Sequence, residues 1–115
     1  MIKITIFRDV QGRVNGYEVK GHANYADAGE DIVCAAISAL SLTGMMAGEK
    51  IACISPEHHP QNGHLVFFDP GNLEHNRQKD LRIILETIAI GMYQTAKNYP
   101  GTVSITDEGG EYSWH

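Results

Sequence analysis

The sequence predicts a single α+β domain in which two helices pack on a mixed β-sheet, with the element order β-β-α-β-β-α-β. Three observations lead to this class. Short β-branched runs open and close the chain, two longer segments carry apolar residues at helical spacing, and Gly, Pro and Asn separate these segments. With 115 residues the chain has the size of one ordinary domain that buries a core without disulfides. We therefore expect one domain over residues 1–115.

The chain opens with a predicted hairpin. Isoleucines alternate with Lys and Thr over residues 2–6, which places three β-branched side chains on one face of a strand. Turn residues at 9–12 let residues 14–20 return as a second strand. Asn15-Gly16 inside that strand either adds a bulge or shifts the turn.

A helix is expected next, from Asp31 to about Gly48, with its start near residues 29–31. Val33, Ile37 and Leu40 recur there at helical spacing, and alanines surround them. The many small residues allow neighbouring backbone to approach closely.

Residues 50–55 and 64–69 read as two further strands that pair as a second hairpin. A polar loop from Glu57 to Gly63 joins them. Cys53 then lies in a strand, with Ile and Ala neighbours, and we interpret it as structural.

The second helix is predicted from an apolar stripe over residues 81–96 that ends before Pro100-Gly101, because proline cannot continue a helix. Ile83 and Ile90 fall off the stripe, so the helix is expected to be buried on two sides, against the sheet and against a partner subunit. Residues 102–106 are a short β-branched run and predict the last strand.

Composition excludes some classes of function. A net charge of -5 argues against broad binding to nucleic acid, because that affinity comes mostly from Lys and Arg. A basic peptide suits such a chain better. The first residues lack the pattern of a secretory leader and no segment looks long enough to span a membrane, so we expect a cytoplasmic protein. Cys34 and Cys53 have no paired spacing and fit reduced thiols in that compartment.

No cofactor or metal is expected. Gly-rich phosphate loops are absent from the sequence. His58, His59 and His64 match no zinc spacing, and we interpret them as solvated histidines near a hairpin tip.

Cys34 is the residue to which the sequence points for chemistry. On the predicted boundaries it lies in the first turn of the first helix, where unpaired amides and the macrodipole favour a thiolate and can meet an oxyanion. His22 closes the preceding strand, and the eleven or so residues between the two are enough for a loop to fold back. Asp31 and Ser38 share one helical stripe with Cys34, and Asp31 could orient His22 or hold the loop.

Each of these residues also has a structural explanation. A lone Cys in an Ala-rich helix is more often a core residue than a nucleophile. Asp31 is by default an acid that satisfies the helix dipole, and Ser38 a small residue that permits packing.

The segment Gly21-His22-Ala23, then Gly29, then residues 31–36 with Ser38, resembles the signature of the bacterial ribosomal-processing cysteine proteases, the Prp family. The resemblance covers nearly the whole chain. It includes the opening hairpin, the long second helix and the closing stretch at residues 99–103.

The resemblance implies an endopeptidase that removes the N-terminal extension of the twenty-seventh protein of the large ribosomal subunit. It assigns the catalytic pair to His22 and Cys34, with supporting roles for Asp31 and Ser38. It also implies a homodimer, no cofactor, and a mobile loop, here residues 23–30, that rearranges around the substrate peptide. Gly21, Ala23, Tyr25 and Gly29 belong to that substrate loop or its flanks.

Two other functions remain open on the sequence. One is a non-catalytic ribosome-assembly factor that binds the same ribosomal protein. The other is a thiol redox sensor, for which Cys53 has no spacing that recommends it as a partner. No direct contact with nucleic acid or membrane is expected. The loop from Glu57 to Gly63 and the tail after Asp107 carry no motif and receive no role.

Overall fold

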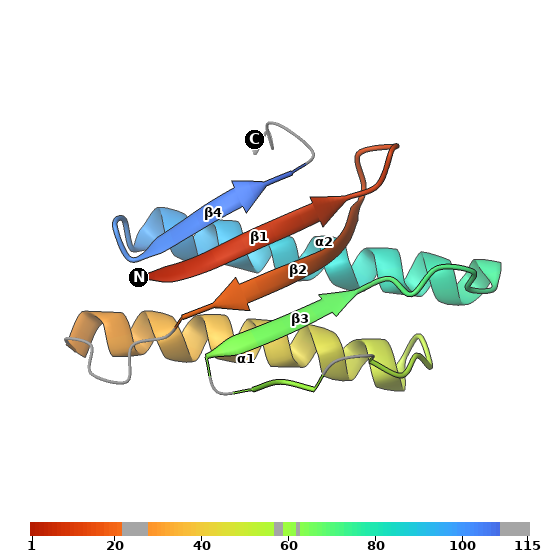
Figure 1. Cartoon of the computed structure of the whole chain (residues 1–115), viewed down its shortest axis with the longest axis horizontal. Helices are drawn as coiled ribbons and strands as arrows, with labels where there is room; N and C mark the ends of the chain where they lie inside the picture. Colours follow the sequence, from red (N-terminus) through yellow and green to blue (C-terminus); the bar gives the residue numbers. More distant parts are fainter. Residues whose placement is uncertain (22–27, 57–58, 62, 109–115) are drawn as a thin grey trace.

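The fold is a mixed β-sheet with two long helices on one of its faces (Figure 1). The computed structural model describes residues 1–21, 28–56, 59–61 and 63–108, and for residues 28–31 the backbone alone. Within these residues the elements are β1 (Ile2–Arg8), β2 (Val14–Lys20), α1 (Ala28–Lys50), β3 (His64–Phe68), α2 (His75–Asn98) and β4 (Val103–Asp107). The described strands lie in the order β3-β2-β1-β4, antiparallel except for the parallel pair β1–β4. The predicted α+β class, with a mixed sheet and two helices, is confirmed.

The opening hairpin forms as the sequence predicts. β1 and β2 pair antiparallel, and the alternating isoleucines of β1 are buried. The register passes from Phe7 opposite Gly16 to Arg8 opposite Val14, so Asn15 is an extra residue on β2. Of the two alternatives that Asn15-Gly16 left open, the bulge is confirmed.

The strand predicted over residues 50–55 is wrong. α1 continues to Lys50 and is followed by a turn in which Cys53 has a φ of 56°. Arg77 of α2 holds this turn, because its Nε donates to the carbonyl of Ala52 at 2.8 Å and its Nη2 to that of Cys53 at 2.6 Å. Ala52 and Ile54 are buried and their neighbours exposed, which reproduces the period of two that a strand shows.

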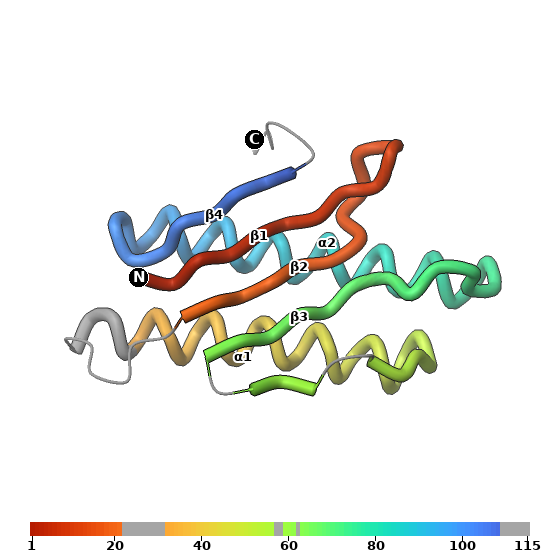
Figure 2. Tube along the Cα trace, in the orientation of Figure 1, coloured from red at the N-terminus to blue at the C-terminus, as the bar shows by residue number. Residues whose placement is uncertain are grey.

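The predicted second hairpin is wrong for the same reason. β3 pairs antiparallel with β2 instead. This pairing places Gly63 and His64 beside the end of the opening hairpin. Figure 2 shows the described part of the chain between α1 and β3 on the β3 side of the sheet.

Helix α1 is strongly apolar. By length and composition alone Ile32–Lys50 is long and apolar enough to span a membrane, contrary to the expectation from the sequence that no segment approaches that length. In the structure, however, Val33, Ile37 and Met45 of this helix belong to the same core cluster as the isoleucines of β1. Core packing therefore accounts for one side of the helix, while Ile32, Leu42 and Met46 are exposed in the single chain.

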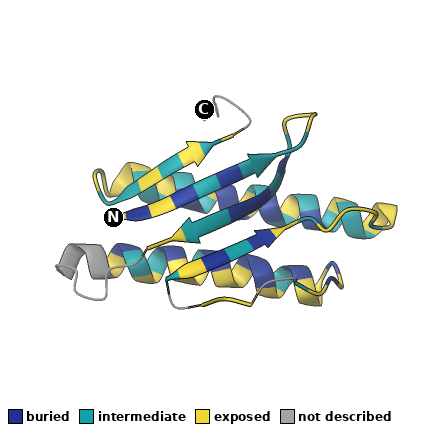
Figure 3. Cartoon of the chain, in the orientation of Figure 1, coloured by how far each residue is buried: buried dark blue, intermediate teal, exposed yellow. Residues whose placement is uncertain are grey.

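Helix α2 also packs against the sheet with its predicted stripe. Leu81, Leu85 and Met92 are buried in the core that α2 shares with β1 and α1, and Figure 3 shows buried positions recurring along β1 and both helices. Ile83 and Ile90, which fall off the stripe, are 58% and 44% exposed in the single chain. Of the two sides of α2 that were expected to be buried, the side that faces the sheet is buried in the single chain, and the side that carries Ile83 and Ile90 is exposed.

Tyr17 fastens β2 to α1. The side chain is fully buried, and its hydroxyl donates to the carbonyl of Ser41 at 2.6 Å and interacts with the backbone amide of Met45. Gly44 makes room for it, because a Cβ there would collide with the Tyr17 hydroxyl. This contact sets the position of α1 over the strand that leads to Gly21.

Tyr17 should make the fold sensitive to alkali. Burial raises the pKa of Tyr17 well above its ordinary value of about 10. Because the unfolded chain then loses this proton at lower pH than the folded one, stability is complete below pH ~10 and falls as the pH rises above it. Tyr17→Phe should cost about 1 kcal/mol at neutral pH, through the lost hydrogen bond, and should weaken the alkaline fall. Urea unfolding of both proteins at neutral pH and at pH ~11 measures this, and equal alkaline losses would contradict it.

Candidate active site

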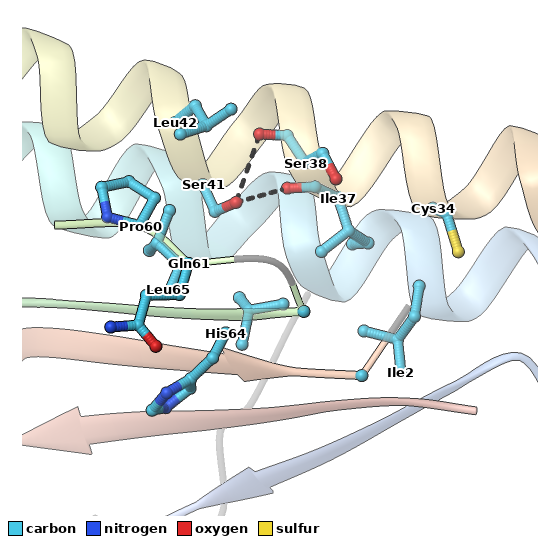
Figure 4. Close-up of a pocket in the computed structure, with 13 residues that line it drawn as sticks. Ile2, Cys34, Ile37, Ser38, Ser41, Leu42, Pro60, Gln61, His64 and Leu65 are labelled. Carbon is cyan, nitrogen blue, oxygen red and sulfur yellow. Dashed lines mark hydrogen bonds between the residues drawn. The ribbon is translucent and has the colours of Figure 1, made fainter. Parts of the chain in front are cut away.

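A pocket of about 100 Å³ lies between α1 and the strand ends that carry Ile2, Gly21 and His64 (Figure 4). Most of its lining is apolar, with two helical serines and a thiol on the α1 side. The lining residues are Ile2, Val19, Gly21, Cys34, Ile37, Ser38, Ser41, Leu42, Pro60, Gln61, Gly63, His64 and Leu65. Three of the sequence-predicted site residues, Gly21, Cys34 and Ser38, therefore meet at one pocket.

Cys34 is half-buried, and its thiol projects from α1 toward the part of the pocket formed by Ile2 (Figure 4). Ser38, one helical turn further along, lines the same pocket, as the spacing of the two residues predicts. Ser41 continues this stripe, and its hydroxyl donates to the carbonyl of Ile37 at 2.8 Å. Sequence reasoning missed Ser41, although its position seven residues after Cys34 was a usable signal.

The predicted place of Cys34 in the first turn of the helix is wrong. α1 begins at Ala28, which makes Cys34 its seventh residue. The macrodipole effect falls off within the first turn, and amides inside a helix are already bonded to carbonyls four residues earlier. Neither activation by the helix end nor an oxyanion hole made by the amides around Cys34 fits this geometry.

The loop expected over residues 23–30 is also shorter than predicted, because residues 28–30 belong to α1. Gly29 is thus a helical residue, and a glycine near the expected boundary misled the prediction of the helix start. Asp31 lies in α1, but its side chain is outside the described part of the structure. His22, Ala23 and Tyr25 lie outside the described residues altogether.

Gly21 brings the end of β2 to the pocket. Its φ of +74° lies in the left-handed region, which glycine adopts without steric cost. Its amide donates to the carbonyl of Gly63 at 2.9 Å, and a Cβ at Gly21 would lie 3.2 Å from the carbonyl oxygen of Met1. The backbone at Gly21 is therefore held in place by the hydrogen bond to Gly63 and by its close approach to Met1.

His64 lies on the rim of the pocket. Its Nε2 is 2.7 Å from Oε2 of Glu18, and Nζ of Lys20 is 3.9 Å from the same oxygen. In Figure 4 the His64 imidazole points away from Cys34. His64 is exposed, as expected, but it forms a cross-strand pair that depends on the β2–β3 pairing the sequence did not reveal.

Among the residues whose side chains are described, no group of three or more His, Cys, Asp and Glu is placed to hold a metal ion. His59 is exposed, and His58 lies outside the described residues.

Cys53 is not part of this site. It is exposed in the turn after α1 rather than in a strand. Lys50 lies 16 positions after Cys34 in α1, which is a rise of about 24 Å, and a disulfide needs Cα atoms within about 7 Å. An intramolecular redox pair of Cys34 and Cys53 is therefore incompatible with the fold.

Comparison with known proteins decides the family. The family model described as "Cysteine protease Prp" matches residues 1–104. The chain belongs to the Prp family of cysteine proteases. The ribosomal processing cysteine protease Prp of Bacillus subtilis (strain 168) is 25% identical over 108 residues, which cover 92% of this chain and 96% of that protein.

Solved structures agree with the fold of this Prp family member. Prp from S. aureus, in complex with a substrate peptide, matches with a TM-score of 0.78 at 21% identity, over 94% of this chain and 100% of that chain. SMU.848 from Streptococcus mutans matches with a TM-score of 0.75 at 28% identity, over 93% of each chain. As a Prp cysteine protease, the chain requires a nucleophilic cysteine, and of its two cysteines Cys34 lines the pocket.

Gly21 can be tested with a matched control. Gly21→Ala and Gly101→Ala both place a Cβ at a φ near +80°, and each should cost about 1–2 kcal/mol of stability. Only Gly21→Ala should also lower the protease kcat/KM, because only Gly21 leads into the segment that carries His22. Urea unfolding and peptide cleavage assays measure the two effects. Equal activity of the two variants would show that the backbone at Gly21 has no part in the site.

Proposed function

We propose that this chain is a cytoplasmic thiol endopeptidase that removes the N-terminal extension of the twenty-seventh large-subunit ribosomal protein during ribosome assembly. Cys34 is the nucleophile and His22 the general base. The family of the chain supports the cysteine protease activity. The name of the Bacillus subtilis relative, a ribosomal processing protease, supports a ribosomal substrate. It involves no cofactor and no direct contact with nucleic acid or membrane.

The main support is that Gly21 and Cys34 line the same pocket. His22 follows Gly21 directly, and a trans peptide bond keeps consecutive Cα atoms about 3.8 Å apart. An imidazole attached at that point begins next to the pocket that holds the thiol. Among the described lining residues the one imidazole is that of His64, which points away from Cys34 and is hydrogen-bonded to Glu18.

The reaction follows from these two side chains. His22 takes the proton of the Cys34 thiol, and the sulfur attacks the carbonyl carbon of the scissile peptide bond. The tetrahedral intermediate collapses as the C–N bond breaks, His22 gives its proton to the leaving amine, and the mature ribosomal protein departs with a new N-terminus. Water, deprotonated by His22, then hydrolyses the thioester and releases the extension as a carboxylate.

Asp31 and Ser38 have supporting roles. Asp31 precedes Cys34 by three residues and orients His22 or holds the segment that contains Ala23 and Tyr25 around the peptide. Because the amides around Cys34 are bonded within the helix, the Ser38 hydroxyl becomes the donor on α1 that lies one turn from the sulfur and lines the pocket.

The pocket suits an apolar residue beside the scissile bond. Val19, Leu42 and Leu65 contribute apolar walls on different elements, and the volume of about 100 Å³ matches one side chain. The net charge of -5 favours a basic protein on the other side of the cut.

We also propose that the active form is a homodimer. Ile83 and Ile90 give α2 an exposed apolar stripe on the side that does not face the core. Burial of such a stripe against a second copy removes apolar area from water.

Digestion of a peptide that spans the junction between extension and ribosomal protein tests the proposal, with the products identified by mass spectrometry. We expect two fragments, one of which begins at the mature N-terminus, and the same result with Cys53→Ser. Binding of the peptide without a new N-terminus would point to the assembly-factor alternative and would contradict a protease.

A further inference from the structure

The outer side of α1 carries an apolar stripe that is exposed in the single chain. The members of this α1 stripe are Ile32, Ala35, Ala39, Leu42 and Met46. Its three large residues are between 41% and 58% exposed. Val33 and Ile37, which α1 buries in the core, lie on the opposite side of the helix. Core packing therefore does not explain why these positions are apolar.

The spacing of the α1 stripe is that of a helix that packs against another helix. Its members follow one another at intervals of three, four, three and four residues, which is the repeat of a coiled-coil seam. Small residues at the centre let the axis of a second helix come close, and large residues at both ends flank it. The stripe therefore indicates a helical partner.

The absence of charge indicates which partner it is. Residues 32–48 contain no Lys, Arg, Asp, Glu or His, although the whole chain has a net charge of -5. A basic protein finds no opposite charge on this side of α1. A lipid surface is disfavoured too, because helices that lie on membranes are rich in Lys and Arg, and α1 has Lys50 as its one basic residue. A second copy of the chain meets the stripe with an apolar, uncharged surface of its own.

The α1 stripe is complementary to itself. In an antiparallel pair of α1 helices with Ala39 on the two-fold axis, Ile32 lies opposite Met46 of the partner subunit, because each is seven positions from Ala39. Leu42 then falls next to Ala35 of the partner subunit, so that a large side chain meets a small one. The two alanines at position 39 allow close approach at the axis.

The exposed isoleucines of α2 extend this surface. α1 and α2 lie side by side on the same face of the sheet (Figure 1), and Leu40 packs so closely on Gly91 that a Cβ there would collide with it. Ile90 precedes Gly91 and points away from the core, as the α1 stripe does. The outer sides of both helices therefore form one apolar face.

Leu42 connects this face with the Cys34 pocket. Its side chain lines the pocket and is 41% exposed, so it has one side in the pocket and another in solvent. We propose that two copies pack antiparallel through the α1 stripe, with Ala39 on the two-fold axis, and that the partner subunit covers the outer side of Leu42 in each pocket. The inference rests on the homodimer of the proposed function, to which it assigns a surface and a role at the site.

Sedimentation velocity of the full chain and of Ala39→Glu tests the surface. We expect the native chain to sediment as a dimer and Ala39→Glu as a monomer, because two carboxylates would meet at the two-fold axis. Val10→Glu adds the same charge at an exposed apolar residue of the β1–β2 turn and should remain a dimer. Monomeric Ala39→Glu should also cleave the junction peptide with a KM several-fold higher, whereas the KM of Val10→Glu should be that of the native chain.

A cross-linking experiment does not depend on whether Ala39→Glu folds. In the Cys34→Ala, Cys53→Ser background, Ala39→Cys supplies the only thiol of the chain. Mild oxidation should join two copies of this variant rapidly, because the close approach at the axis brings the two positions within reach of a disulfide. Val10→Cys in the same background should be joined much more slowly.

Four results would overturn the inference. A native chain that sediments as a monomer would remove it together with the homodimer, and cleavage of the peptide by that monomer would leave the protease proposal in place. A dimer that persists in Ala39→Glu, with equal cross-linking at positions 39 and 10, would place the interface elsewhere. Binding of the native chain to phosphatidylglycerol vesicles that is lost in Ala39→Glu would assign the α1 stripe to a lipid surface. An unchanged KM in monomeric Ala39→Glu would show that the partner subunit has no part in the pocket.

Discussion

Cleavage of the extended ribosomal peptide should fall on the order of 10⁶-fold in Cys34→Ala, the size of loss found when the nucleophile of a hydrolase that forms an acyl-enzyme is removed. No other described residue of the pocket offers a thiol, and a serine hydroxyl on an interior helical turn lacks the ionisation that makes sulfur nucleophilic. Ala at position 34 should leave the fold intact, because the neighbouring helix positions 35 and 36 are already alanine. Initial rates, measured by mass spectrometry of the released extension, give the ratio.

Cys53→Ser is the matched control, since it removes the other thiol at an exposed turn outside the pocket. It should retain the rate of the native chain. If Cys34→Ala retained that rate while Cys53→Ser lost it, the nucleophile would have been assigned to the wrong cysteine.

His22→Ala should lower cleavage by about 10²–10⁴-fold and should also change the chemistry of the Cys34 thiol. Because Cys34 is the seventh residue of α1, the helix end does not supply the activation, and an imidazolium partner is the remaining source. Alkylation of Cys34 at neutral pH should therefore be faster in the native site than in His22→Ala, because the thiolate is the reactive form.

This experiment is best performed in the Cys53→Ser background, so that only Cys34 reacts. His64→Ala is a second control, because His64 lines the pocket but points away from the sulfur, and Cys34 should be alkylated in this variant at the rate of the native site. Identical alkylation rates for His22→Ala and the native site would leave the His22 imidazole without a role in activation.

Local patterns were enough to predict most of the fold. The alternation of residues 2–6 and the stripe of α2 each specify one element and its buried face, and both agree with the structure. The turn at residues 51–54 was mistaken for a strand because its residues are alternately buried and exposed, as in a strand. The turn is held by hydrogen bonds from a residue that is distant in the sequence. Arg77 lies 24 residues away in the sequence, and its hydrogen bonds to carbonyls leave no signal in the local pattern.

The side of the pocket that α1 forms was predictable from the sequence, because it depends on local spacing. The helical spacing of Cys34 and Ser38 places them on one face, and they do line one pocket. What the sequence could not supply is the partner surface, since Gly63 and His64 reach the pocket only through the pairing of β3 with β2. A boundary error of three residues at the start of α1 also changed the expected chemistry, because helix-end effects act over a single turn.

Mapping the covalent intermediate tests the central claim most directly. The Cys53→Ser protein is mixed with the extended peptide, quenched in acid and digested, and the adduct is located by fragment mass spectrometry. We predict a thioester in which the acyl group of the extension is carried by Cys34. An adduct on any other residue would contradict the assignment of Cys34 as the nucleophile.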